Sequence, residues 1–145
     1  MGVNKIPIFF HSNQIEFKPK YEWALGNRIK HPETTKRAET IYKELNKSPE
    51  LFEIIEPKKI PQKLIRQVHS YSLLNLYNTA SNLDEEEEFY PCVFPQRMNA
   101  HPDPTNIKNA GFYCFDSGTP LNKNTWSAAA WSAACAFEAA NAIWF

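Results

Sequence analysis

Short apolar runs and stretches of helical spacing alternate along the first half of the chain. Residues 6–10 and 52–55 are apolar runs rich in β-forming side chains, and each predicts a short strand. Between them, apolar side chains recur three and four positions apart over residues 38–45, which predicts a helix. We expect this helix to start at residues 31–34, where Pro and Glu stand early, and to stop near the Ser-Pro pair at 48–49.

The alternation continues to residue 80 and predicts an α/β fold. Residues 61–68 and 70–80 carry apolar side chains at helical spacing, so we expect a short helix followed by a longer one. The resulting order of strand, helix, strand, helix favours a parallel sheet covered by helices. Residues 11–30 lack a clear period and contain Pro19 and Gly26, and we expect an irregular loop there.

The second half of the chain predicts a long irregular segment and one final helix. Residues 81–124 show no period, and the acidic run at 84–88 is interpreted as a solvated loop tip rather than a cation site. The helix is predicted to begin with Thr125 as its N-cap and to run to the last residue. It is rich in alanine and apolar nearly all round, so we expect a core helix buried on several sides and not a membrane span.

Charge and cysteine usage narrow the functional classes. The 145 residues include 16 Lys and Arg and 16 Asp and Glu, so the net charge is zero. No basic patch points to nucleic acid or to a membrane surface. Cys92, Cys114 and Cys135 form no CxxC pair and have apolar neighbours, which indicates buried, reduced thiols and a cytoplasmic location. The length fits a single domain over residues 1–145.

No self-contained catalytic set is recognisable. The four histidines, His11, His31, His69 and His101, lie far apart and form no HExxH pattern, so no zinc site is expected within this chain. Ser-His-Asp or Cys-His groups could still meet in space, but no GxSxG turn favours them. A glycine-rich phosphate loop is also absent from the sequence.

The most informative segment is the loop at 111–120, GFYCFDSGTP, which precedes the final helix. Loops of this kind, with Gly, Pro and aromatic residues, often line a site. The side chains of Phe112, Tyr113 and Phe115 either wall a binding site or pack the loop against the helix. Asp116 either accepts a hydrogen bond from a substrate or holds the loop through an Asx-turn, and the second role is favoured.

Several segments together resemble one family, the zinc-dependent deacetylases that include histone deacetylases and bacterial acetylpolyamine amidohydrolase-like enzymes. Their order and spacing are shared across nearly the whole chain. The segments are His31-Pro32-Glu33 with Arg37-Ala38-Glu39, Val68-His69-Ser70 with Tyr71 and Leu74, Tyr90-Pro91 through Phe94-Pro95, the loop at 111–120, and Thr125-Trp126. The resemblance implies the N-terminal part of an arginase/deacetylase-type parallel sheet flanked by helices, with a long irregular loop before a C-terminal Ala-rich helix.

The resemblance also implies that the domain over residues 1–145 is incomplete. In that family the zinc ligands, the catalytic His pair and the Tyr that polarises the acyl carbonyl lie beyond the point where this chain ends. The complete family enzyme uses zinc to remove acetyl groups from acetyl-lysine or acetylated amines. With no metal ligand, base or cofactor of its own, the chain alone is expected to be inactive.

A fragment of this kind would be a truncated or interrupted gene product. Its expected partners are the missing C-terminal half or a second copy of the chain. One alternative is a non-catalytic binding or assembly module that pairs with a second chain carrying the metal half, with the apolar final helix as its interface. Another is a small stand-alone α/β domain.

Individual positions also carry expectations from the resemblance. Arg37 matches the family's arginine near the inner cavity behind the metal, and its alternative is a surface arginine. The loop residues that would form the tunnel rim are Phe112, Tyr113, Phe115 and Asp116. Acetylpolyamine-selective members carry acidic residues around this loop. Lys108 and Gly118 stand there in this chain, which argues against polyamine selectivity.

Overall fold

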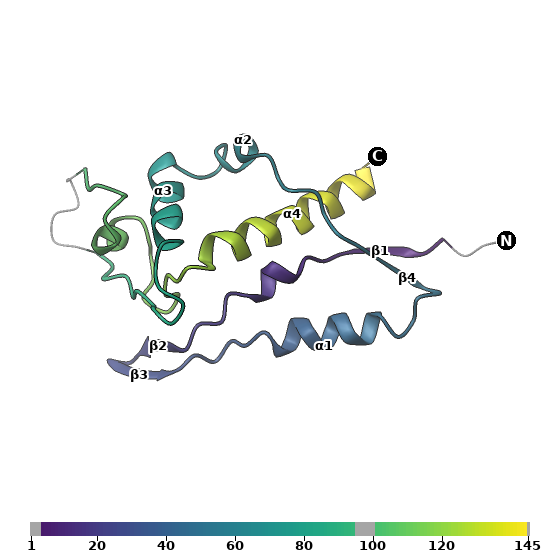
Figure 1. Ribbon diagram of the computed structural model, residues 1–145, viewed down its shortest axis with the longest axis horizontal. Coiled ribbons are helices and arrows are strands. Elements are labelled where there is room, and N and C mark those ends of the chain that lie inside the picture. The colour runs from purple at the N-terminus through teal and green to yellow at the C-terminus, as the bar shows by residue number, and fades with distance from the viewer. Residues whose placement is uncertain (1–3, 95–100, 145) are drawn as a thin grey trace. The chain divides into compact units, whose positions relative to one another are not determined.

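The computed structural model describes residues 4–94 and 101–144, so Pro95 of the family motif lies outside the described residues. Figure 1 shows the order of helices and strands along the chain. The residues fall into two compact units. The first unit comprises Met1–Phe17, Thr35–Pro61 and Ser127–Phe145, and the second unit comprises Lys18–Thr34 and Gln62–Trp126.

The first unit contains a two-stranded parallel sheet. β1 (Ile6–Phe9) pairs with β4 (Phe52–Ile55), with Ile6 opposite Phe52 and Phe9 opposite Ile55. α1 (Lys36–Leu45) lies between the two strands in the chain, as the connection of a parallel pair requires. Both predicted strands and the order strand, helix, strand are confirmed.

The start of α1 differs from its prediction. The helix begins at Lys36, and residues 31–34 form no helical turn. Pro32 disfavours helical geometry in the residue before it. The imidazole of His31 accepts a hydrogen bond from the backbone N–H of Glu33 at 3.2 Å, which holds the chain in a bend. The prediction of a helix start at 31–34 is therefore wrong.

α4 (Thr125–Trp144) begins at the predicted residue, but Thr125 is not its N-cap. The hydroxyl oxygen of Thr125 accepts a hydrogen bond from the backbone N–H of Asn122 at 2.9 Å, upstream of the helix. The side-chain oxygen of Asn122 in turn accepts from the N–H of Asn124 at 2.9 Å. Asn122 therefore organises the helix entry, which corrects the prediction for Thr125.

Burial along α4 is uneven. Ala128 and Ala134 are buried, whereas Ile143 and Trp144 are 87% and 83% exposed. The prediction of burial on several sides thus fails toward the end of the helix. None of the helices in residues 4–94 and 101–144 is long and apolar enough to cross a membrane.

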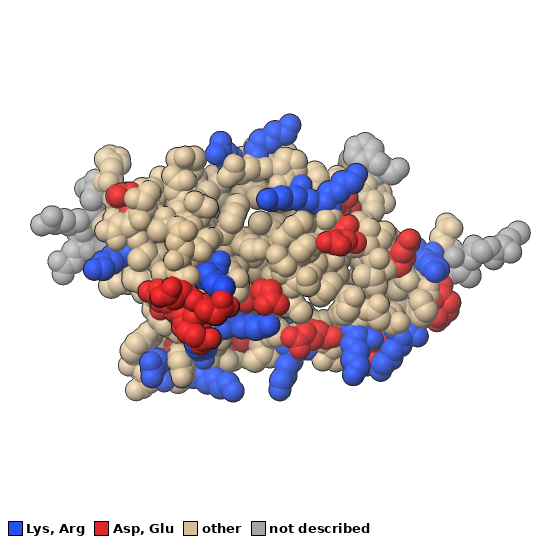
Figure 2. Space-filling view, viewed as in Figure 1, with Lys and Arg blue, Asp and Glu red and all other residues tan. Residues whose placement is uncertain are grey.

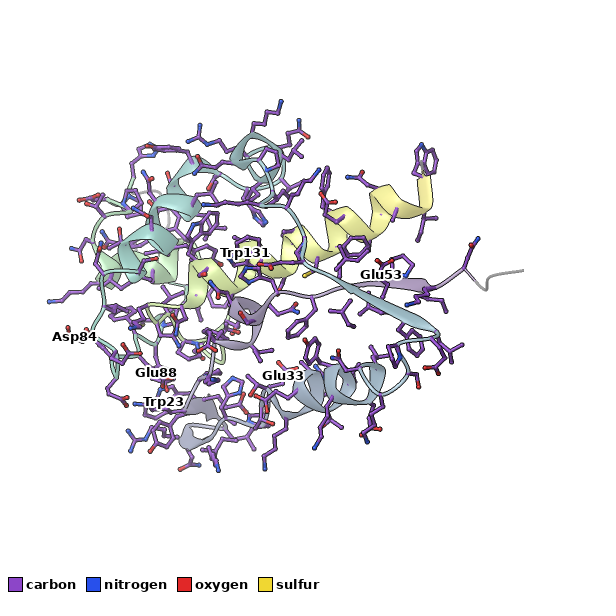
Figure 3. All side chains as sticks on the ribbon, turned by 45° about the vertical axis from the view of Figure 1, so that its right-hand side comes forward. Trp23, Glu33, Glu53, Asp84, Glu88 and Trp131 are labelled. Atoms are coloured by element: carbon purple, nitrogen blue, oxygen red, sulfur yellow. The ribbon has the colours of Figure 1, made fainter. Side chains whose placement is uncertain are left out.

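Stacked rings hold the first unit together beside its sheet. Phe10 stacks on Tyr42 of α1 with ring centroids 4.2 Å apart. His11 stacks on Trp131 of α4, labelled in Figure 3, with centroids 3.5 Å apart and an angle of 6° between the planes. The Nε2 atom of His11 lies 3.2 Å from Glu56 Oε1. Because His11 follows β1 and Glu56 follows β4, this contact joins the carboxyl ends of the two strands.

The second unit begins with a β-hairpin where an irregular loop was expected. β2 (Tyr21–Ala24) and β3 (Asn27–Lys30) pair antiparallel. Leu25 and Gly26 form the two-residue turn with φ of 51° and 78°, the geometry of a type I′ turn. The 3₁₀ helix η1 (Ser12–Ile15) interrupts the expected loop as well, in the first unit. The prediction for residues 11–30 is wrong because Leu-Gly is an unusual turn pair.

The helices predicted for the second unit are confirmed. α2 (Gln62–Ile65) is a single turn, and α3 (Tyr71–Ala80) follows it. Ser70 caps α3, since its side-chain oxygen accepts a hydrogen bond from the N–H of Leu73 at 3.2 Å.

The core of the second unit is a cluster of buried aliphatic side chains. Leu76 and Ala80 come from α3, Ala110 from the 3₁₀ helix η2 (Ile107–Phe112), and Leu121 from the segment before α4. Leu121 also forms an isolated antiparallel bridge with Phe89. The long segment between α3 and α4 is mostly irregular, as predicted, and this core fixes it in place.

The cysteines do not all follow their prediction. Cys114 and Cys135 are half-buried and Cys92 is exposed, and all three are free thiols. The predicted burial is wrong for Cys92, which follows the fully buried Pro91 and turns outward from it.

Candidate functional site

The loop at 111–120 walls a cavity of about 310 Å³ in the second unit, here called the loop cavity. Its opposite wall is the start of α3 and the residues just before it. The lining residues are His69, Leu73, Tyr77, Tyr113, Cys114, Phe115, Asp116, Thr119, Leu121 and Thr125. Leu121 also belongs to the aliphatic core, so the cavity floor is part of the packed interior.

A glycine with a tight neighbour opens this loop. A Cβ atom at Gly111 would lie 1.7 Å from the carbonyl oxygen of Cys92, well inside van der Waals contact. Only glycine allows the two backbone segments to cross so closely. Behind it, the N–H groups of Tyr113 and Cys114 both donate to Ala110 O at 2.9 Å, which closes a tight turn.

The side chain of Asp116 makes a hydrogen bond to the backbone of the loop. Its Oδ1 atom accepts a hydrogen bond from the N–H of Thr119 at 2.7 Å, three residues on and not the two of the predicted Asx-turn, so Asp116 makes a different local contact with the loop backbone. Gly118 lies inside this closed turn. A Cβ atom at Gly118 would be 3.5 Å from Asp116 Oδ1 and 3.6 Å from Glu22 Oε2, so two carboxylates approach the same point on the rim.

The hairpin is fastened to this rim by His31. The Nδ1 atom of His31 accepts from the N–H of Glu33, which assigns the ring proton to Nε2. That Nε2–H donates to Gly118 O at 3.1 Å. The contact spans 87 positions in the sequence and brings Glu22 of β2 to the loop.

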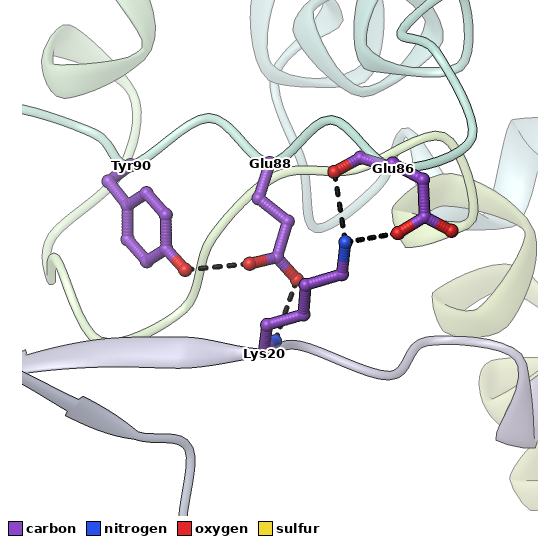
Figure 4. Close-up of polar contacts among 4 residues, drawn as sticks. All are labelled: Lys20, Glu86, Glu88 and Tyr90. Atoms are coloured by element: carbon purple, nitrogen blue, oxygen red, sulfur yellow. Dashed lines mark hydrogen bonds and ion pairs between the residues drawn. The ribbon is translucent and has the colours of Figure 1, made fainter.

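A second set of contacts fastens the hairpin to the acidic run, as Figure 4 shows. The backbone N–H of Lys20 donates to Glu88 Oε1 at 2.7 Å, and the Lys20 ammonium forms an ion pair with Glu86. Their hydrogen bond raises the pKa of Lys20 and lowers the pKa of Glu86. The Tyr90 hydroxyl donates to Glu88 Oε2 at 2.7 Å, and burial together with this bond raises the pKa of Tyr90.

The acidic run is thus an exposed loop tip, as predicted, but the carboxylates of residues 85–88 accept hydrogen bonds or form ion pairs. Glu85 forms an ion pair with Lys123 just before α4. Figure 2 shows the Asp and Glu side chains gathered around a Lys or Arg in this part of the surface, and Figure 3 shows Glu88 beside the strand of Trp23. The run therefore ties β2 and the start of α4 to one loop.

Two groups that line the loop cavity, the Cys114 thiol and the Tyr77 phenol, have raised pKa values. Burial and the nearby Asp116 raise the pKa of the Cys114 thiol to about 11. Burial, with smaller contributions from Cys114 and Asp116, raises the pKa of the Tyr77 phenol. Thiolate, not thiol, is the nucleophilic form of cysteine. At neutral pH Cys114 is therefore held as the thiol and is not a nucleophile.

The structure brings together only some of the residues singled out from the sequence. Tyr113, Phe115 and Asp116 line the loop cavity, and Phe115 is 86% exposed at its mouth. Phe112 is half-buried and is not among the lining residues. Arg37 lies exposed in the first turn of α1, in the first unit.

Glu22 and His31 approach the loop beside Gly118 without lining the cavity. The motif analysis singled out His31 but gave it no place at this loop, and it did not single out Glu22. The alternation of Tyr21-Glu22-Trp23-Ala24 was the available signal, because it is the pattern of a strand with one polar face.

A zinc ion does not fit the residues described. Residues 4–94 and 101–144 contain no group of three His, Cys, Asp or Glu side chains that could hold a metal ion. No step of a zinc mechanism can therefore be derived from these side chains.

Known proteins resemble this chain in both sequence and fold. The acetylpolyamine amidohydrolase 2 of Pseudomonas aeruginosa is 29% identical over 83 residues, which is 54% of this chain and 24% of that protein. The crystal structure of an acetylpolyamine aminohydrolase from Burkholderia pseudomallei matches with a TM-score of 0.78 and 23% identity, over 96% of this chain and 41% of that one. The chain thus spans less than half the length of either relative.

The structural match confirms the predicted fold class, the α/β arrangement of a deacetylase-type parallel sheet flanked by helices. A family model described as the histone deacetylase domain matches residues 31–144. This range holds the His-Pro motif, the loop cavity and α4. Because the match covers most of the sequence, the chain belongs to the histone deacetylase family.

Proposed function

We propose that the chain is the N-terminal part of a zinc-dependent amidohydrolase that removes acetyl groups from acetylated amines, and that it is inactive alone. The family match supports the reaction class. The chain covers 24% and 41% of the two relatives' lengths, which supports the dependence on further protein. The free thiols suit a reducing compartment, and a cytoplasmic location is part of the proposal.

One observation carries the substrate class: Glu22 and Asp116 approach a common point beside Gly118. Asp116 lines the aromatic-walled loop cavity, and Glu22 approaches the same loop beside Gly118. Two carboxylates placed in this way favour a positively charged amine over a neutral amide. The relatives' names specify acetylpolyamines, which are amines of this kind. Lys108 is exposed in η2 and does not line the loop cavity.

The test separates activity from binding. The purified chain with added zinc is assayed on N-acetylputrescine and on an acetyl-lysine peptide, and its zinc content is measured. We expect no turnover above buffer and less than one bound zinc per chain. Zinc-dependent turnover by the chain alone would refute the inactivity.

Binding to the rim is measured by NMR with N-acetylputrescine and with the neutral N-butylacetamide. We expect tighter binding of the charged ligand and a loss of that preference in Glu22→Gln and Asp116→Asn. Glu53→Gln, an exposed carboxylate on β4, is the control and should leave it unchanged. Equal binding of the two ligands by the original chain would refute the proposed substrate class.

A second candidate is the assembly module that pairs with another chain. The exposure of Ile143 and Trp144 favours it, because large apolar side chains in contact with water often mark interfaces. Sedimentation of the purified chain tests self-association. Replacement of both residues by Ser should reduce any association, and an unchanged assembly would exclude this end of α4 as the interface.

A further inference from the structure

A second cavity in the second unit is lined by none of the residues of the loop cavity. It measures about 210 Å³ and lies between α2, α3 and the first turn of α4. We call it the polar cavity. Tyr71, Leu74, Asn75 and Asn78 contribute to it at the spacing i, i+3, i+4, i+7, which places them on one face of α3.

The polar groups of this cavity come from two helical turns. Gln62 and Arg66 are four residues apart at α2 and point to the same side, toward the two asparagines of α3. No carboxylate lines the cavity within the part of the chain that the structure describes. Figure 2 shows Lys and Arg side chains along the edge of the molecule where Figure 1 places α2. The cavity is therefore positively charged.

An aromatic ring fixes the cation in place. The guanidinium carbon of Arg66 lies 5.2 Å from the ring centroid of Tyr71, within the range of a cation–π contact. Stacked in this way, the planar guanidinium loses less freedom when it binds a second group. Arginine with amide neighbours suits a carboxylate, which accepts two parallel hydrogen bonds from the guanidinium.

Two apolar residues, Leu74 and Trp126, complete the mainly polar lining. Leu74 is buried, and the ring of Trp126 lies 6.4 Å from that of Tyr77, which braces it from behind. The volume is below the roughly 300 Å³ at which pockets for drug-sized ligands begin, so the occupant must be small. We propose that the polar cavity binds a small carboxylate that carries an apolar group. This inference does not depend on the proposed function.

The test is an NMR titration of the isotope-labelled full chain with sodium benzoate at constant ionic strength. The indole N–H of Trp126, identified through Trp126→Phe, reports on the cavity. We expect a shift that saturates. Arg66→Gln should weaken binding by about tenfold or more, because it removes a charge-assisted hydrogen bond.

Lys63→Gln is the matched control. It removes a cation from the same short helix without touching the cavity and should change the affinity less than twofold. Asn78→Leu keeps every charge and fills the amide side of the cavity, so it should also weaken binding. It tests the site independently if Arg66→Gln unfolds.

Three outcomes would overturn the proposal. The first is a shift that never saturates. The second is equal weakening by Arg66→Gln and Lys63→Gln, which would indicate a general charge effect. The third is binding of inorganic phosphate as tight as that of benzoate, which would deny a role to the apolar walls.

Discussion

Different kinds of contact stabilise the interior of each of the two units. The largest fully buried side chains among the described residues, Leu76, Pro91, Pro120 and Leu121, all belong to the second unit. In the first unit, α1 buries none of its residues and α4 buries the small Ala128 and Ala134, so strand pairing and stacked rings provide a larger share of the contacts. Aliphatic burial is nondirectional and large, whereas ring pairs contribute about 0.5–1.5 kcal/mol beyond their burial. The loop cavity is therefore built on the more firmly packed unit.

The strongest test of this difference is the removal of core volume from the second unit. Leu76→Ala should lower the free energy of unfolding by about 3 kcal/mol, because Leu76 is fully buried and the mutation leaves a cavity. Urea unfolding measures this change in the free energy of unfolding, and hydrogen exchange across α3 shows whether the loss lies in this unit. Ile41→Ala on α1 is the counterpart in the first unit. Since Ile41 is 54% exposed, this mutation should lower the free energy of unfolding by less than about 1 kcal/mol. Equal losses at both positions would remove the contrast.

The close backbone approach under the loop gives the next largest effect. Gly111→Ala should lower the free energy of unfolding by about 2 kcal/mol or more. The reason is that the new Cβ would lie 1.7 Å from a backbone oxygen that cannot rotate away. Gly118→Ala is the matched control. The new Cβ there meets side chains at 3.5 and 3.6 Å, which is ordinary contact, so little change is expected. Thermal unfolding distinguishes the two, and a harmless Gly111→Ala would show that the loop can yield.

The ring contacts of the first unit are tested at His11. His11→Ala removes the stack on Trp131 and the hydrogen bond that its Nδ1 atom accepts from Asn13 N–H at 3.1 Å. We expect the free energy of unfolding to fall by about 1 kcal/mol. This change would be detected as faster hydrogen exchange in β1 and β4. Ser12→Ala, at the exposed neighbouring position, should be neutral. Unchanged exchange in His11→Ala would mean that strand pairing alone holds this unit.

The smallest expected effect is on stability and comes from backbone strain in the hairpin turn at Leu25, which lies outside the core of the second unit. Leu25 is fully exposed and has a φ of 51°, a conformation that asparagine adopts more readily. Leu25→Asn should therefore stabilise the protein by about 0.5 kcal/mol. Leu25→Ala, which keeps a residue unsuited to this φ, should bring no gain. If both variants were more stable than the original chain, the cause would be the loss of exposed apolar surface and not the geometry of the turn.

Elements with a clear local period were predictable, and elements made by unusual turns were not. β1 and β4 follow from short apolar runs rich in β-forming side chains, and α2 and α3 follow from apolar residues at helical spacing. The hairpin escaped prediction because Leu25, the first residue of its turn pair, is not a residue that normally adopts positive φ.

The candidate site divides in the same way. Tyr113, Phe115 and Asp116 were identifiable because they stand together in one loop of marked composition. Glu22 and His31 were not, because they reach that loop only through the hairpin, across long stretches of chain. The polar cavity is of the same kind, since three separate helical turns form it.

The sequence by itself determined the family, the parallel strand pair with its connecting helix, and the loop that lines a cavity, because each depends on neighbours in the chain. Only the tertiary structure decided that Glu22 joins Asp116 at the rim, that the acidic run pairs with Lys20 and Lys123, and that Arg66 lies over Tyr71. Those contacts join residues whose side chains meet only after the backbone has folded. Local pattern specifies an element and its buried face, whereas the assembly of elements sets which charges meet.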